Sequence, residues 1–196
     1  MDARPEPVDG GRARSGSGRS RLFVALDLPD TVRDALESAG RAADPEAWRP
    51  VPRQSLHVTL AFLGPRPATD VALIAPVVAA EAHAPPLALH HVLLLPPRRP
   101  RVLTVELSDP TGALTALQAR VCAALHAAGV YTPEKRAYRP HVTIARLRPR
   151  VRPPRDAAIA LEPLAFHGTA VTLYVSRLHP HGARYEPLAS ATLDAG

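Results

Sequence analysis

Two copies of one short motif dominate this sequence: HVTL (57–60) within LHVTLAFLG and HVTI (141–144) within PHVTIARL, 84 residues apart. Each copy lies in a run rich in β-branched and aliphatic residues, which predicts a strand. Residues i and i+2 of a strand face the same side, so each copy presents an imidazole beside a hydroxyl, with its apolar residues on the opposite side. If the chain folds into two similar lobes, the two motifs can face each other across a cleft.

The four polar side chains of the motifs, His57, Thr59, His141 and Thr143, are the candidate catalytic residues. One neutral imidazole could take a proton from an attacking oxygen while the other, as imidazolium, protonates the departing oxygen of a phosphodiester. The hydroxyls could donate hydrogen bonds to the non-bridging phosphate oxygens. The alternative is that both imidazoles are ordinary sheet histidines. A metal centre is less favoured, because neither histidine has a carboxylate or thiol at ligand-like spacing.

Outward from the motifs, the pattern predicts strands and helices in irregular alternation. Strands are expected at 21–28, 56–64, 87–95, 101–107 and 141–147, with two more near 164–176 and 185–193. Helices are expected from Asp30 to Gly40, from Thr69 to His83 with a kink at Pro76, and over 110–128, while 42–55 is expected to be irregular. Several strand pairs are joined too closely for a βαβ crossover, so the fold class is α+β with mainly antiparallel sheets.

The N-terminal residues 1–20 are rich in Gly, Ser, Pro and Arg, and we expect them to form a disordered tail before one domain over 21–196. The 24 basic residues outnumber the 18 acidic ones, and all but Lys135 are arginine. An arginine-rich surface favours polyanionic partners, although a GC-rich coding sequence would give the same bias. The single cysteine, Cys122, fits a reducing compartment, and no apolar run is long enough to cross a membrane.

With both motifs in view, the chain resembles the 2H phosphoesterase superfamily, and within it the RNA 2′,3′-cyclic phosphodiesterases that are also called 2′-5′ RNA ligases. The resemblance rests on RLFVALDLP (21–29), LHVTLAFLG (56–64), RPHVTIARL (139–147) and YEPLASATL (185–193). It implies a bilobal fold of two antiparallel sheets related by pseudo-twofold symmetry, with the helices outside and the motifs lining a central cleft.

The resemblance also implies a role for each site residue. His57 corresponds to the proton donor, His141 to the proton acceptor, and Thr59 and Thr143 to phosphate-binding hydroxyls. Arg146 corresponds to a phosphate-binding arginine, although strict alternation places it opposite His141 unless the strand ends or bulges.

Phe23 is a further candidate for substrate binding, by stacking on a base, with core packing as the alternative. The adjacent His90 and His91 are expected to face opposite sides of their strand and so not to bind one ion.

The expected function is metal-independent hydrolysis of RNA 2′,3′-cyclic phosphate ends to 2′-phosphomonoesters, with reverse 2′-5′ ligation, and without any cofactor or metal. Its partners would be RNA ends, tRNA fragments among them, and no membrane. We expect a monomeric, cytoplasmic enzyme. Two alternatives stay open: an RNA- or nucleotide-binding module without turnover, and a related enzyme acting on small cyclic nucleotides.

Overall fold

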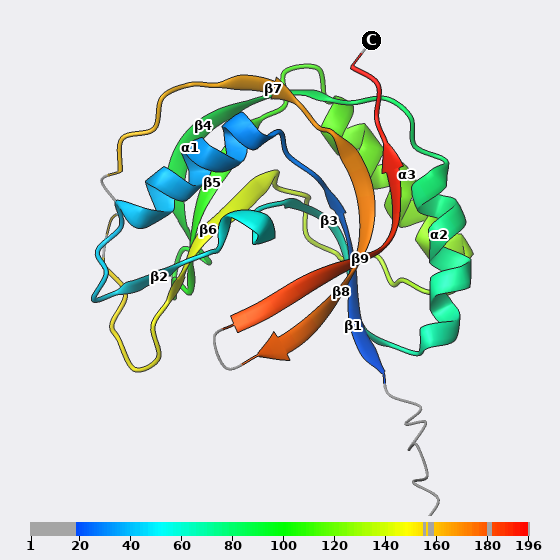
Figure 1. The fold of residues 1–196 in the computed structure, drawn as a ribbon, viewed down its shortest axis with the longest axis horizontal. Coiled ribbons are helices and arrows are strands. Elements are labelled where there is room, and N and C mark those ends of the chain that lie inside the picture. Colours follow the sequence, from blue (N-terminus) through cyan, green and yellow to red (C-terminus); the bar gives the residue numbers. More distant parts are fainter. Residues whose placement is uncertain (1–18, 155, 157–158, 180–181, 196) are drawn as a thin grey trace, which may run out of the picture.

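A computed structural model describes residues 19–154, 156, 159–179 and 182–195 (Figure 1). Most of the expected tail, residues 1–18, lies outside these ranges. The first strand begins at Ser20, one residue before the expected start of the domain, and the Arg19 guanidinium donates to the backbone carbonyl of Pro65.

The elements follow the expected order closely. The strands are β1 (Ser20–Leu26), β2 (Trp48–Pro50), β3 (Val58–Arg66), β4 (Pro86–Leu95), β5 (Val102–Ser108), β6 (His141–Leu147), β7 (Ala165–His167), β8 (Ala170–His179) and β9 (Gly182–Thr192). The helices are α1 (Asp30–Arg41), α2 (Val71–Ala79) and α3 (Ala113–Ala127), with short 3₁₀ turns η1 (Arg53–Ser55) and η2 (Ala68–Asp70). Helix α2 contains Pro76 and is shorter than expected, and β2 lies within a segment expected to be irregular.

The described strands form one strongly curled antiparallel sheet in the order β7-β4-β5-β6-β3-β1-β8-β9, with β2 also paired to β6 (Figure 1). The α+β class and the antiparallel pairing are confirmed. The expected two sheets are instead continuous, because the two motif strands β3 and β6 pair through Val58 and Val142. That junction places the two motifs side by side at the centre of the sheet.

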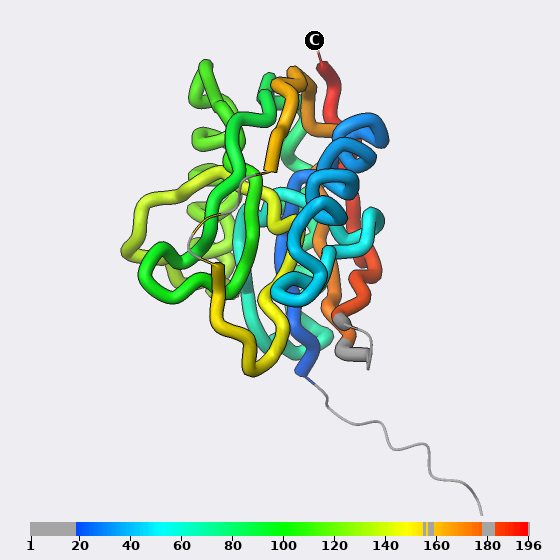
Figure 2. The backbone as a smooth tube through the Cα atoms, turned by 90° about the vertical axis from the view of Figure 1, so that its left-hand side faces the viewer, coloured from blue at the N-terminus to red at the C-terminus, as the bar shows by residue number. Residues whose placement is uncertain are grey.

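Each motif strand is backed by a helix from the other half of the chain. Helix α1, which follows β1, packs against β6, and helix α3, which follows β5, packs against β3. Figure 1 shows α1 on the left and α3 on the right, and Figure 2, viewed from that left-hand side, has α1 near the viewer. The Gln118 amide of α3 donates to the carbonyl of Leu60, a buried residue that alternation places on the side of β3 away from Thr59. The helices thus lie outside the motif face, as expected.

The core between sheet and helices is continuous and takes the apolar side of both motifs. Val58 and Leu60 of the first motif, and Val142 and Ile144 of the second, are each at most 3% exposed. Burying an aliphatic side chain of this size stabilises the fold by roughly 1.5–3 kcal/mol. This burial fixes which side chains of the motif strands can face outward.

No helix in the described part of the chain is long and apolar enough to span a bilayer.

Gly40 allows α1 to lie directly against β6, and its substitution tests that packing. A Cβ at this position would stand 2.7 Å from the backbone oxygen of Ile144. We expect Gly40→Ala to lower the free energy of unfolding by about 1–3 kcal/mol, since overpacking outweighs the ~1 kcal/mol gain in helix propensity. Urea unfolding measures the change. The control is Ser38→Ala, at an exposed position of the same helix, which should not lower the free energy of unfolding. Equal stability of Gly40→Ala and the wild type would refute the close contact.

Candidate functional site

The side chains of both motifs line one recess at the junction of β3 and β6. The recess is bounded by Val51, Ser55, His57, Thr59, His141, Thr143, Arg146 and Tyr185. Its volume is about 50 Å³. Its lining of imidazoles, hydroxyls and a guanidinium suits a compact polar group such as a phosphate.

Both imidazoles are held by the same backbone contact. His57 Nδ1 lies 2.8 Å from the carbonyl oxygen of Ser55, and His141 Nδ1 lies 2.7 Å from that of Arg139. A carbonyl oxygen can only accept, so Nδ1 carries the proton in both rings. Each Nε2 is left free for exchange with a ligand, which is the arrangement that proton transfer requires.

Further side chains fix the segment that ends at His57. The Arg33 guanidinium of α1 donates to the carbonyl oxygens of Leu28 at 2.9 Å and Leu56 at 2.8 Å, and lies 3.7 Å from the Asp27 carboxylate. Asp27 also accepts from the Tyr174 hydroxyl at 2.9 Å. These charge-assisted bonds tie α1 and the end of β1 to the residue preceding His57.

A β-bulge brings Arg146 into the recess. In the β5–β6 pairing, Thr104 is opposite Thr143 but Leu103 is opposite Ala145, so Ile144 is the extra residue on β6. The bulge shifts the alternation by one residue. Ala145 is therefore buried, and Arg146 faces the same side as Thr143 and lines the recess.

The first motif carries a matching bulge. In the β1–β3 pairing, Ala25 is opposite Thr59 but Val24 is opposite Ala61, so Leu60 is the extra residue. The residue that corresponds to Arg146 in the first motif is then Phe62, whose side chain is 51% exposed. Aligning the two repeats would have identified this residue from the sequence.

The structure contradicts the prediction that Phe23 stacks on a substrate base. Its side chain is only 3% exposed, because its ring is covered by those of His57, Tyr174 and Tyr185, with centroids 4.8–5.4 Å away. Phe23 instead forms the apolar support behind the His57 ring. Tyr185, which sequence reasoning missed, also lines the recess, with its ring edge-on to His57 at 5.3 Å; nothing in its local sequence marks it.

This apolar support changes the protonation of His57. Burial lowers the pKa of His57 from 6.5 to about 4, against the opposing effect of the Ser55 carbonyl. The positive charges of Arg146 and Arg33 lower it further. The ring is therefore neutral at pH 7 in the empty recess, and a bound anion would favour its protonation.

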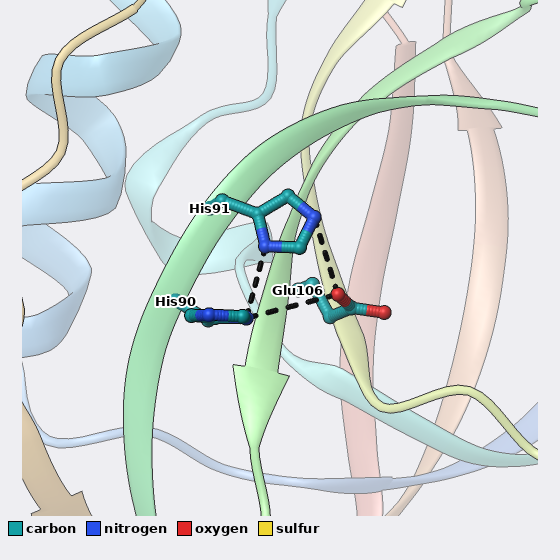
Figure 3. Close-up of side chains that lie close together, drawn as sticks. All are labelled: His90, His91 and Glu106. Carbon is teal, nitrogen blue, oxygen red and sulfur yellow. Dashed lines mark hydrogen bonds and ion pairs between the residues drawn. The ribbon is translucent and has the colours of Figure 1, made fainter.

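The expectation that His90 and His91 face opposite sides of their strand is wrong. The pairing of β4 with β5 shifts between Leu89 and Val92, and this irregularity brings both imidazoles to one place, with ring centroids 4.4 Å apart. Both rings also contact the Glu106 carboxylate of β5 (Figure 3). The local sequence gives no sign of the shift.

A family model described as the 2′-5′ RNA ligase superfamily matches residues 28–180 of this chain. The RNA 2′,3′-cyclic phosphodiesterase of Escherichia coli is 30% identical over 175 residues, which cover 86% of this chain and 93% of that protein. The protein of the same name from Thermus thermophilus is 48% identical over 52 residues, and this match spans 26% of each chain.

Solved structures show the same similarity at the level of the fold. The crystal structure of E. coli LigT complexed with 3′-AMP has a TM-score of 0.71 and 27% identity, and covers 89% of this chain and 98% of its own. The crystal structure of TT0787 from T. thermophilus has a TM-score of 0.72 and 26% identity over the same shares. The similarity thus includes nearly all described elements.

The environment of His57 gives a testable pH dependence. Because the folded protein takes up this proton only near pH 4 while the unfolded chain does so near pH 6.5, His57 contributes stability above pH 6.5 that is lost as the pH falls toward 4. We expect the wild type to lose about 2–3 kcal/mol more unfolding free energy than His57→Gln between pH 7 and pH 4. Urea unfolding at both pH values measures this difference, and parallel losses in the two proteins would contradict the pKa shift.

Proposed function

Because the chain belongs to the 2′-5′ RNA ligase superfamily, we propose that it hydrolyses 2′,3′-cyclic phosphodiester ends of RNA to 2′-phosphomonoesters. One observation carries the proposal: two imidazoles with the same Nδ1 contact and two threonines line a single small recess. This arrangement provides two proton-transfer groups and two hydrogen-bond donors for one phosphate.

We assign the proton acceptor to His141 and the proton donor to His57. His141 Nε2 takes a proton from water as the water oxygen bonds to phosphorus. The bond from phosphorus to O3′ breaks, and His57 Nε2–H donates its proton to O3′, which leaves a 3′-hydroxyl and a 2′-phosphate. No metal ion is required, because both proton transfers use side chains already present.

The low pKa of His57 connects donor protonation to substrate binding. In the empty recess the ring is neutral, and the charges of Arg146 and Arg33 oppose its protonation. The negative phosphodiester offsets these charges and favours the imidazolium that the donor role needs. The donor would thus be charged mainly when a substrate is bound.

Thr59, Thr143 and Arg146 are assigned to the non-bridging oxygens of the phosphate. The two threonine hydroxyls project from the same face of the sheet as the motif histidines. The bulge at Ile144 turns the Arg146 guanidinium to that face as well. Charge grows on these oxygens as water attacks, so donors fixed in advance stabilise the transition state more than the ground state.

A 2′-5′ ligation would use the same groups. A 5′-hydroxyl of RNA in place of water would attack the cyclic phosphate, give its proton to His141 and form a 2′-5′ linkage as His57 protonates O3′. This ligation needs no additional residue.

The proposal also covers the oligomeric state, the domain organisation, the compartment and the RNA substrate. We infer a monomeric enzyme, one bilobal domain over 21–196, that acts in the cytoplasm on RNA ends such as those of tRNA fragments. The buried, unpaired thiol of Cys122 supports a reducing compartment.

Incubation with an oligoribonucleotide ending in a 2′,3′-cyclic phosphate tests the proposal. The wild type should produce the 2′-phosphomonoester at the same rate with and without EDTA. His57→Ala and His141→Ala should each lose at least ~100-fold in kcat, because each removes one proton-transfer group. Product identity by chromatography and rate by initial velocity are the measurements.

The matched control is His126→Ala, an exposed histidine on α3 outside the recess, which should keep the wild-type rate. RNA binding without product would support the alternative of a binding module, and cleavage of 2′,3′-cyclic AMP alone would support a small-nucleotide enzyme. Either result would overturn the proposed substrate, and near-normal rates in either active-site variant would overturn the two-histidine assignment.

A further inference from the structure

Beside the motif histidines, three potential metal ligands meet on strands β4 and β5 (Figure 3). His91 Nε2 lies 3.3 Å from Glu106 Oε2, and His90 Nδ1 lies 3.8 Å from the same oxygen. The two Nδ1 atoms are 2.9 Å apart. His90 and His91 are both exposed and thus open to an ion from solution, while Glu106 is partly buried.

The cluster lies on the same face of the sheet as the recess. Glu106 is directly opposite His141 in the β5–β6 pairing, and the bond from Leu107 N–H to Pro140 O makes this a non-hydrogen-bonded pair. Side chains of such a pair share one face, with Cβ atoms about 4.5–5.5 Å apart. The three groups therefore lie next to His141 on the same face of the sheet, outside the set of residues that line the recess.

The spacing of the donor atoms suits one tetrahedral ion. Bonds of about 2.0–2.1 Å to imidazole nitrogen and carboxylate oxygen place neighbouring ligand atoms roughly 3.3–3.4 Å apart. The separations from Glu106 Oε2 to His91 Nε2 and His90 Nδ1 are 3.3 and 3.8 Å, and the three ligand atoms all lie within 4.8 Å of one another. The histidine side chains therefore have to rotate to close on one ion. Two imidazoles with one carboxylate are a donor set typical of zinc and related transition metals.

Arg139 orients the carboxylate for such a role. Its guanidinium donates to Glu106 Oε1 at 2.6 Å, which leaves Oε2 turned toward the histidines. The same contact lowers the pKa of Glu106 below its ordinary value, so the carboxylate is ionised at neutral pH. A hydrogen bond to the second oxygen of a ligating carboxylate is the usual support for a metal ligand.

We propose that His90, His91 and Glu106 bind one divalent transition-metal ion of the zinc class on the sheet face beside His141. When the ion binds, His90 Nδ1 gives up its hydrogen bond to His91 Nδ1 and coordinates the ion instead. His91 coordinates the ion through Nε2. Three protein ligands leave at least one coordination position for water or for a phosphate oxygen of an RNA strand. The site does not rest on the proposed function, and its test needs no activity measurement.

Titration of the metal-free protein with Zn²⁺ in a calorimeter, repeated with Co²⁺ and read by visible absorption, tests the site. The wild type should bind one Zn²⁺, and Co²⁺ should give the absorption of a tetrahedral ion. Glu106→Gln and His91→Gln should each weaken Zn²⁺ binding at least ~10-fold, since even the loss of a supporting residue costs 10–100-fold. His126→Gln should bind as tightly as wild type.

Two results would overturn the proposal. One is equal Zn²⁺ affinity in wild type and Glu106→Gln. The other is loss of binding in His57→Ala with retention in Glu106→Gln, which would place the ion in the recess instead. Circular dichroism of each variant checks that it is folded, so a loss of binding can be assigned to the missing ligand.

Discussion

The contact between each motif imidazole and a backbone carbonyl two residues upstream is the constraint on which the site depends. It fixes the proton on Nδ1 of both His57 and His141 and turns both Nε2 atoms outward. The pairing of Val58 with Val142 then places the two rings around one recess. Burial of the alternate motif residues makes this arrangement costly to change, because a one-residue slip would move apolar side chains into solvent.

The sequence alone was sufficient to predict the strands that carry the motifs, the α+β class and the meeting of the four polar motif residues in one recess. The strands rest on period-two alternation, which depends on residue type at each position. The α+β class rests on the short connections between strands, and the meeting of the motifs rests on their repetition and on the family resemblance. The bulges could not be predicted in this way, because an extra residue in one strand is decided by the partner strand. Arg146, His90 and His91 all owe their direction to such shifts. Phe23 was misjudged for a related reason: its burial comes from Tyr174 and Tyr185, which are distant in the chain.

The protonation of His57 depends on two kinds of neighbour, aromatic rings and positive charges. Phe23 and Tyr185 exclude water from His57, while Arg146 adds positive charge. The recess therefore favours the neutral ring, and a bound anion would favour its protonation. Across the β5–β6 pair, Glu106 and the two adjacent histidines form a separate group of potential metal ligands beside His141. Arg139 links the two places, since its carbonyl accepts from His141 and its side chain holds Glu106.

The central claim is that both imidazoles act on one phosphorus atom. The most direct test is a crystal structure of the protein with a short RNA that ends in a 2′-phosphate, the expected product. His57 Nε2 and His141 Nε2 should both lie within hydrogen-bond distance, about 3 Å, of oxygens bonded to that one phosphorus. A phosphate that contacts only one of the two rings, with the other directed into a separate space, would contradict it.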